Sequence, residues 1–316
     1  MVPTLDDLYG AVKGDLLALL RDSRLSEPFL QIVEKALVGA GKVLSSNPRS
    51  RWPLLVLLPC WAAGGNWRNA LPVATAAELV GVATELFDDV EDGDDSTLVD
   101  SIGAPRTVNL ASALLAFAGR SLCRSSALVG DRIWQALVTA ADGQDSDLGE
   151  GLPTTPDEYL AIVDRKSAGL TAALCWAGAR LSGATSPVLD GYERFGLYVG
   201  RWGQLVNDSH DVWPGVTGKS DLQRRLSTLP LIFLLRSPEN PESGHLREYL
   251  AGDDPLLPGE EATLREALWA SGALHYTWLV AEASRDAAES ALREVCPATE
   301  ASVLLGHLLS PRPPAG

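Results

Sequence analysis

Apolar residues recur with a helical period in almost every segment of this 316-residue chain, and this pattern limits the possible folds most strongly. In residues 6–20 one helical stripe is apolar: Leu8, Val12, Leu16, Leu17 and Leu20. The alternation typical of strands is scarcely seen. We therefore predict an all-α protein, with one domain over residues 1–310 and a Pro-rich disordered tail at 311–316. The domain would be a bundle of roughly ten to thirteen helices around a central apolar cavity.

The expected helices follow from apolar periodicity and from turn and cap residues. They cover residues 6–20, 25–41, 54–63, 72–92, 104–123, 131–148, 155–181, 186–211 and 221–235, with Pro230 inside the last of these. We expect residues 238–259 to be irregular and two helices to close the chain. No low-complexity linker divides the chain.

Composition excludes several classes of protein. A formal net charge of −15 disfavours binding to nucleic acid or to an anionic membrane. The four cysteines form no CxxC pair, as expected of buried free thiols in a reducing cytoplasm. We expect a soluble, cytoplasmic protein, because neither a signal peptide nor an apolar run of membrane-spanning length is evident.

The most distinctive stretch is acidic. Residues 85–95 hold seven carboxylates directly after an apolar helical run, and Asp88, Asp89 and Asp92 stand at i, i+1 and i+4. On a helix, i and i+4 share a face, so like charges there repel unless a cation neutralises them. Mg²⁺ prefers such oxygen ligands and often binds one or two carboxylates together with substrate phosphates. The stretch therefore predicts a Mg²⁺–phosphate site.

A second cluster has the same spacing. Asn207, Asp208 and Asp211 end another long, largely apolar helical segment. Two such helices could face one another across a cavity and hold a group of Mg²⁺ ions between them. Walls of Ala, Val, Leu and Thr below the acids favour an apolar substrate. This combination indicates an allylic isoprenoid diphosphate, whose leaving diphosphate the metals would stabilise while water is excluded.

These motifs resemble those of the polyprenyl synthetase family, which has the isoprenoid synthase fold. The matching elements are Asp88-Asp89-Val90-Glu91-Asp92, Gly143-Gln144-Asp145-Ser146-Asp147, Lys166-Ser167, Gln204, Asn207-Asp208-Ser209-His210-Asp211 and the segment Asp221-Leu222 to Thr228-Leu229-Pro230. The resemblance implies metal ligation and catalysis by Asp88, Asp89, Asp92, Asn207, Asp208 and Asp211. It also implies three Mg²⁺ ions, with Mn²⁺ as a substitute.

Further residues are candidates for substrate binding. By resemblance, Lys166 contacts diphosphate, and Gln204 matches the Gln that precedes the second motif. Gln144 and Asp147 could simply end a helix, but we favour contacts with the cavity. Arg201 could reach the same pocket or lie on the surface, and Arg49 could be a ligand or a surface residue.

Departures from the family pattern bear on the reaction. Elongating members use basic residues to bind isopentenyl diphosphate, yet Trp52 stands where one such Arg is expected and residues 96–102 contain no basic side chain. We therefore expect ionisation of farnesyl or geranylgeranyl diphosphate followed by cyclisation or elimination, as in a terpene synthase. The alternatives are a prenyltransferase, which elongates a chain or prenylates an acceptor such as a peptide, and an inactive partner subunit. By resemblance, the protein could be a homodimer.

Overall fold

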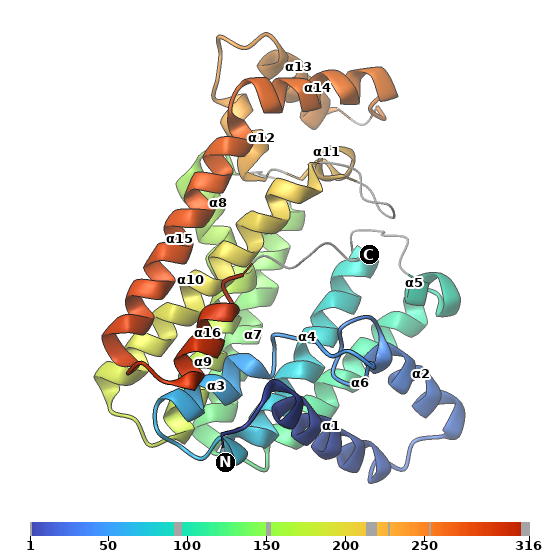
Figure 1. Cartoon of the computed structure of the whole chain (residues 1–316). Coiled ribbons are helices and arrows are strands. Elements are labelled where there is room, and N and C mark those ends of the chain that lie inside the picture. The colour runs from blue at the N-terminus through green and yellow to red at the C-terminus, as the bar shows by residue number, and fades with distance from the viewer. Residues whose placement is uncertain are drawn as a thin grey trace. The chain divides into compact units, whose positions relative to one another are not determined.

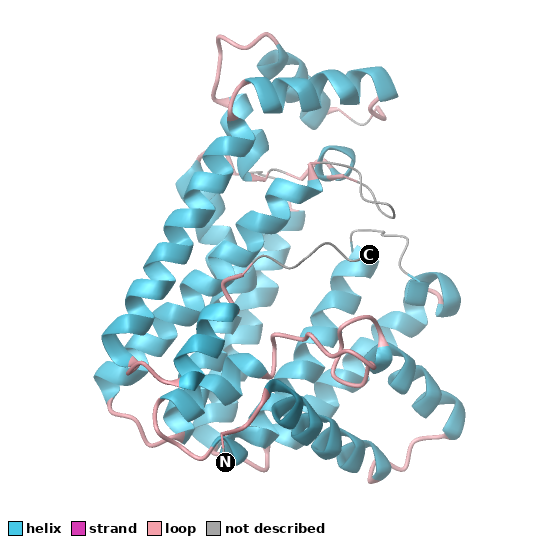
Figure 2. Ribbon diagram, in the orientation of Figure 1, coloured by secondary structure: helices cyan, strands magenta, loops and turns pink. Residues whose placement is uncertain are grey.

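The computed structural model describes residues 2–91, 97–149, 153–212, 220–226, 228–252 and 254–310. Within these ranges the chain forms helices and loops and no strand (Figure 2), which confirms the all-α prediction. Internal contacts divide the chain into two compact units. The single domain over 1–310 stays a prediction, and the predicted tail at 311–316 lies outside the described residues.

The first unit comprises Met1–Gln135, Thr171–Gly196 and Ala291–Leu308. Its own helices, labelled in Figure 1, are α1 (Leu5–Arg21), α2 (Glu27–Val38), α3 (Leu54–Ala62), the 3₁₀ turn η1 (Trp67–Ala70), α4 (Leu71–Glu91), α5 (Thr97–Ile102), α6 (Ala104–Leu122) and α16 (Glu300–His307). The central helix is α4, which packs along α6 and also contacts α1 and α3.

Burial of α4 explains its unusually apolar sequence. By length and composition, the stretch Trp67–Glu91 could cross a membrane, but 72% of its most apolar window is buried inside the protein. Its side chains are buried from Val73 to Ala83, and exposure rises from Thr84 toward the acidic end. A helix that is apolar on all sides belongs in a core. The acidic motif is thus carried by the end of a core helix.

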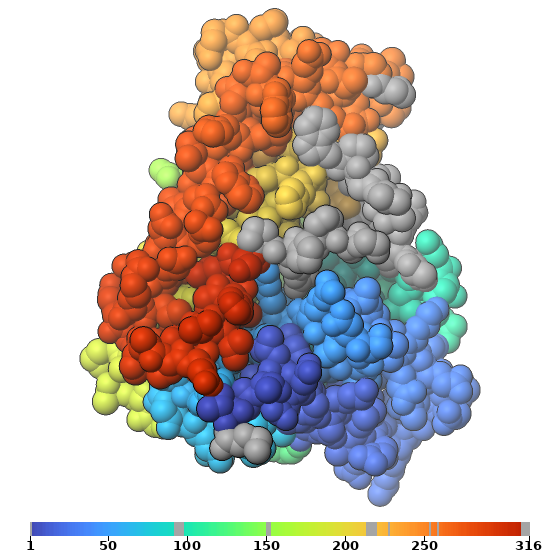
Figure 3. Space-filling view, in the orientation of Figure 1, coloured from blue at the N-terminus to red at the C-terminus, as the bar shows by residue number. Residues whose placement is uncertain are grey.

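The second unit comprises Ala136–Leu170, Leu197–Ser290 and Leu309–Gly316. Its own helices are α8 (Pro156–Val163), the π-helical turn η2 (Asp164–Ala168), α11 (Asp221–Arg224), α12 (Leu229–Leu235), α13 (Glu242–Ala251) and α14 (Pro258–Ala270). Four longer helices contribute residues to both units: α7 (Ala127–Leu148), α9 (Gly169–Leu181), α10 (Ser186–Asp211) and α15 (Ala273–Val295). Figure 3 shows that α15, in orange to red, lies at the surface of the face in view.

Several expected boundaries are wrong. Residues 221–235 are not one helix, because Arg225 adopts a left-handed conformation (φ 60°) and ends α11. Pro230 lies in the first turn of α12, where its missing N–H costs nothing.

Other helices were not expected at all. Residues 238–259 include α13, whose apolar period is weak because it buries only Ser243 and Leu246. Three helices, not two, follow residue 257, and α5 adds to the total, so the described residues contain sixteen α-helices. Short helices that bury few side chains leave little periodicity in the sequence.

Glycine allows close contact between helices of the first unit. A Cβ atom on Gly178 of α9 would lie 2.2 Å from the Val56 carbonyl oxygen of α3. No side chain fits at that distance, because protein interiors are close-packed and the obstacle is backbone.

We predict that Gly178→Ala destabilises the protein by about 1–3 kcal/mol through overpacking, which exceeds the gain of about 1 kcal/mol from helix propensity. Gly10→Ala is the matched control: Gly10 lies inside α1, and a Cβ atom added there would have nothing within 4 Å, so Ala should stabilise the protein. Urea unfolding midpoints measure both effects. A Gly178→Ala midpoint at or above that of the wild type would contradict the close contact.

Candidate active site

The first acidic motif ends α4. Asp88 and Asp89 lie in its last turn, and both are half-buried. The C-terminal end of a helix carries partial negative charge, so carboxylates there are disfavoured unless a cation compensates them. Asp92, the third predicted ligand of this motif, lies outside the described residues. Two of the three acids therefore occupy a place where a bound cation would stabilise them.

A basic residue that no sequence pattern indicated pairs with an acid one turn before Asp88 and Asp89 on α4. The ammonium group of Lys42 pairs with the carboxylate of Glu85, and the Lys42 side chain is only 17% exposed. Glu85 precedes Asp88 by three residues and Asp89 by four, so it shares their side of α4. Lys42 and Glu85 are 43 positions apart, which is why no local pattern could connect them.

The loop that carries Lys42, residues 39–53, is fastened to α4 by Glu78. The fully buried Glu78 carboxylate accepts a hydrogen bond from the Val43 backbone N–H at 2.9 Å and another from the Ser50 hydroxyl. Burial raises the pKa of Glu78, against the opposing effects of both hydrogen bonds and of the Lys42 charge. The loop is thus anchored to the core helix by a buried polar contact.

Arg49, a predicted substrate contact on this loop, has an exposed side chain, and its backbone N–H donates to the Gly41 carbonyl oxygen at 2.8 Å. Trp52 lies against α4, where a Cβ on Gly81 would be 2.1 Å from the indole Nε1 atom. An aromatic ring therefore covers α4 two turns before Asp88. Contact between Arg49 and a substrate stays a prediction.

In the second unit, a π-helical turn places Lys166. This turn, η2, interrupts the helical segment predicted over 155–181, and such turns are rare and frequent at functional sites. The end of α7 approaches it closely, because a Cβ on Gly143 would lie 2.3 Å from the Lys166 backbone nitrogen. The Lys166 ammonium group reaches Asp147 Oδ2 at 2.5 Å. Two of the six predicted substrate contacts, Asp147 and Lys166, thus touch one another, and a third, half-buried Gln144, lies on the same helix end as Asp147.

Side chains of α10 brace this turn. Arg201 forms a two-point ion pair with Asp164 through Nε and Nη2. The Ser167 hydroxyl donates to Gln204 Oε1 at 3.1 Å. Arg201 is therefore engaged with the protein itself, and its predicted contact with substrate would require it to share or leave this pair.

Asp208 is the most enclosed acid of the second motif. Its side chain accepts hydrogen bonds from the Tyr159 hydroxyl and, at 3.1 Å, from Gln204 Nε2. Burial raises the pKa of Asp208 to about 7, and the charges of Asp211 and Asp147 add to the rise, while the two hydrogen bonds oppose it. Tyr159 was not among the predicted site residues, since a Tyr in an apolar helix gives no sign of its distant partner.

The other two members of the second motif are exposed. Asn207 and Asp211 are four residues apart and share one side of α10, whereas Asp208 is turned into the protein. The three predicted ligands therefore present two different environments. Asn207 and Asp211 are open to solvent, and Asp208 is nearly inaccessible before any ligand binds.

Asp221, at the start of α11, is a further member of this acidic cluster that was not among the predicted site residues. Its side chain is 3% exposed. Burial raises its pKa to about 8, and the charges of Asp208 and Asp211 raise it further, while Thr228 and Arg224 act in the opposite direction. Arg265 hydrogen-bonds both the Val212 carbonyl oxygen and the Ser220 hydroxyl oxygen, the neighbours of Asp211 and Asp221 in the chain, so these two acids lie in one region. The sequence signal was present, since Asp221-Leu222 belongs to the segment that resembled the family.

The donor set fits Mg²⁺. Carboxylate oxygens from Asp88 and Asp89 in one unit, and from Asp208, Asp211 and Asp221 in the other, are the hard ligands that this ion prefers. Among the described residues, no three His, Cys, Asp or Glu side chains are grouped closely enough to hold a metal by themselves. The two motifs facing one another across a cavity stays a prediction.

Sequence comparisons find similar proteins among prenyl diphosphate synthases. Geranylgeranyl diphosphate synthase of Mycobacterium tuberculosis is 37% identical over 201 residues, which cover 58% of this chain and 57% of that protein. The match thus spans less than two thirds of that relative's length. Short chain isoprenyl diphosphate synthase of Methanothermobacter thermautotrophicus is 26% identical over 280 residues, which cover 83% of this chain and 85% of the relative.

Solved structures confirm the predicted isoprenoid synthase fold. Polyprenyl synthase of Caulobacter crescentus, solved with calcium and isoprenyl diphosphate, superposes with a TM-score of 0.84 at 24% identity over 96% of this chain and 95% of that one. Geranylgeranyl pyrophosphate synthase of Corynebacterium glutamicum gives a TM-score of 0.79 at 22% identity and covers 96% of this chain and 90% of its own. The polyprenyl synthetase family model matches residues 41–266, which is more than half of the sequence. The chain therefore belongs to the polyprenyl synthetase family.

Proposed function

We propose that this protein is a prenyltransferase that joins an allylic prenyl diphosphate to isopentenyl diphosphate and so lengthens the prenyl chain. The main support for the proposal is the family match over residues 41–266. The similar proteins are also named as synthases of prenyl diphosphates. The acids at the ends of α4 and α10 and the position of Lys166 support it. The sequence alone favoured cyclisation over elongation. We now prefer elongation, because the comparisons support it and offer no support for cyclisation.

In the proposed reaction, the bond between C1 of the allylic chain and its diphosphate oxygen breaks, and the electron pair leaves with the diphosphate. The double bond of isopentenyl diphosphate then attacks the allylic cation. The resulting cation gives a proton to the departing diphosphate, and the longer prenyl diphosphate forms. When bound, Mg²⁺ would balance the charge that develops on the leaving group. Asp88, Asp89, Asp208 and Asp211 would hold the metal, and Lys166 would bind diphosphate oxygens.

The proposal also includes three metal ions, substitution by Mn²⁺ and a homodimeric state, which rest on the family alone. It includes a cytoplasmic location, which rests on the sequence. Cyclisation of farnesyl or geranylgeranyl diphosphate stays the second candidate. The observation that favours it is the indole ring of Trp52, packed on Gly81 where the family pattern has an arginine. An apolar ring there weakens the binding of a second anionic substrate.

Incubation with Mg²⁺, farnesyl diphosphate and radiolabelled isopentenyl diphosphate distinguishes the two candidates. We expect label in a longer prenyl diphosphate and no pyrophosphate release when isopentenyl diphosphate is left out. Hydrocarbon or alcohol products with pyrophosphate release from farnesyl or geranylgeranyl diphosphate alone would favour cyclisation. Absence of turnover with every substrate would favour the inactive partner subunit.

We predict that Asp88→Ala lowers turnover by about a hundredfold or more, because a charge that stabilises the leaving group through the metal is lost. Glu91→Ala is the matched control, since Glu91 is an exposed acid of the same helix end and is not a proposed ligand. Its rate should stay close to that of the wild type. Equal rates for Asp88→Ala and wild type would refute the assignment of Asp88.

The buried acids predict how stability depends on pH. Folding raises the pKa of Asp208 to about 7 and of Asp221 to about 8, so the folded protein binds more protons than the unfolded chain above pH 4. The metal-free protein should therefore lose stability as pH rises from about 4 to 8.

Thermal unfolding measured across this range checks the prediction. Mg²⁺ with pyrophosphate should restore the midpoint most at pH 8, where the acids are charged and can bind the ion. Asp221→Asn should flatten the metal-free pH dependence. A flat profile in the wild type would contradict the effect of burying these two carboxyl groups.

A further inference from the structure

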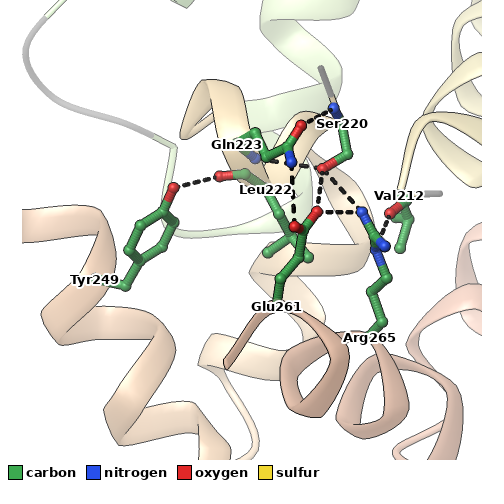
Figure 4. A network of polar contacts seen from close by, with 7 residues as sticks. All are labelled: Val212, Ser220, Leu222, Gln223, Tyr249, Glu261 and Arg265. Atoms are coloured by element: carbon green, nitrogen blue, oxygen red, sulfur yellow. Dashed lines mark hydrogen bonds and ion pairs between the residues drawn. The ribbon is translucent and has the colours of Figure 1, made fainter. Parts of the chain in front are cut away.

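A polar cluster on α14 connects the end of α10 with the start of α11 (Figure 4). The guanidinium Nε of Arg265 donates to the Val212 carbonyl oxygen at 3.0 Å, and its Nη2 donates to the Ser220 hydroxyl oxygen at 3.3 Å. Val212 directly follows Asp211, and Ser220 directly precedes Asp221. A single side chain therefore holds the backbone on both sides of residues 213–219, next to two acids of the cluster.

The partner of Arg265 is Glu261, one helical turn earlier. The Glu261 carboxylate accepts hydrogen bonds from the Ser220 hydroxyl and from Gln223 Nε2, each at 3.1 Å, and forms an ion pair with Arg265 (Figure 4). The side chains of Glu261 and Arg265 are 10% and 15% exposed. A largely buried pair whose oxygens and N–H groups also bind neighbours has one favoured geometry, because any departure leaves a charge unsatisfied.

An apolar core packs beside this polar cluster. Its buried members come from the end of α10 and from α11, α12, α13, α14 and α15: Val212, Leu222, Leu231, Leu234, Leu246, Leu264, Ala267, Leu268 and Ala273. From α13, the Tyr249 hydroxyl donates to the Leu222 carbonyl oxygen at 2.8 Å. The helix that bears Glu261 and Arg265 therefore shares an apolar core with Val212 and with Leu222 of α11 even without the ion pair.

We infer that Arg265 and Glu261 are positioning residues, which set Asp221 relative to Asp208 and Asp211 so that these acids can bind a divalent metal together with diphosphate. This inference rests on the proposed function for the identity of the ligand. Once ionised, carboxylates this near one another repel, so contacts from elsewhere in the fold are needed to hold them in place as a cation binds. Groups that orient metal ligands without touching the metal commonly change metal affinity by about 10–100-fold when removed.

If Glu261 and Arg265 served only to stabilise the fold, variants that still fold would bind the metal like the wild type. A buried ion pair replaced by apolar side chains of similar volume often leaves stability unchanged or improves it, because no charge has to be desolvated. Glu261→Met/Arg265→Met should therefore fold, yet it cannot hold the Val212 carbonyl oxygen or the Ser220 hydroxyl. Arg265→Lys keeps the charge, but a single ammonium group cannot reproduce the fork that bridges Val212, Ser220 and Glu261.

The test is Mn²⁺ binding in the presence of inorganic pyrophosphate, followed by electron paramagnetic resonance of the free ion. We expect affinity to fall by about tenfold in Arg265→Lys and in the double Met variant. Arg285→Gln is the matched control, because Arg285 forms a similar intrahelical ion pair with Glu282 on α15. It should bind Mn²⁺ like the wild type. Thermal unfolding of each variant separates affinity from loss of fold.

Wild-type Mn²⁺ affinity in a folded Arg265→Lys or double Met variant would overturn the inference, as would equal losses in Arg285→Gln. The inference and the proposed function can fail separately. If the wild type binds Mn²⁺ and pyrophosphate with the expected dependence on Arg265 but transfers no prenyl group, only the proposed function fails. If the wild type elongates prenyl chains, and the variants reach half-maximal rate at the same Mg²⁺ concentration as the wild type, only the inference fails.

Discussion

The cost of ionising carboxylates that the fold buries or places at a helix C-terminus is the constraint on which the rest of this structure depends. Asp88 and Asp89 lie at the negative end of the core helix α4, where the helix dipole disfavours their charge. Asp208 and Asp221 are buried, and the charge of Asp211 raises the pKa of both. A bound cation would lower the cost of ionising the acids in either place.

The surrounding structure supplies the connections that such a site needs. Glu78 anchors the loop of Lys42 to α4, and Gly143 lets the π-helical turn bring Lys166 to Asp147. Arg265 joins the chain on both sides of residues 213–219. Each connection links segments far apart in sequence through a buried or partly buried polar contact, whose geometry is more restricted than that of an apolar one.

Sequence predicted the helical class, most long helices and the family, because apolar periodicity and acid spacing are local patterns. It also placed Lys166 and Asp147 at one site. It did not reveal Lys42, Tyr159, Glu261 or Arg265, whose roles depend on partners distant along the chain. Short helices such as α13 were missed for a related reason, since they bury few side chains. The preference for cyclisation gave weight to missing basic residues, and the named relatives favour elongation instead.

The central claim is that the acids act with Mg²⁺ to bind a prenyl diphosphate. Calorimetric titration with an unreactive thiolo analogue of farnesyl diphosphate tests it most directly. We expect tight binding with Mg²⁺ present, little binding when the ion is chelated, and loss of the Mg²⁺ effect in Asp208→Ala. Binding of equal strength with and without Mg²⁺ would contradict the claim.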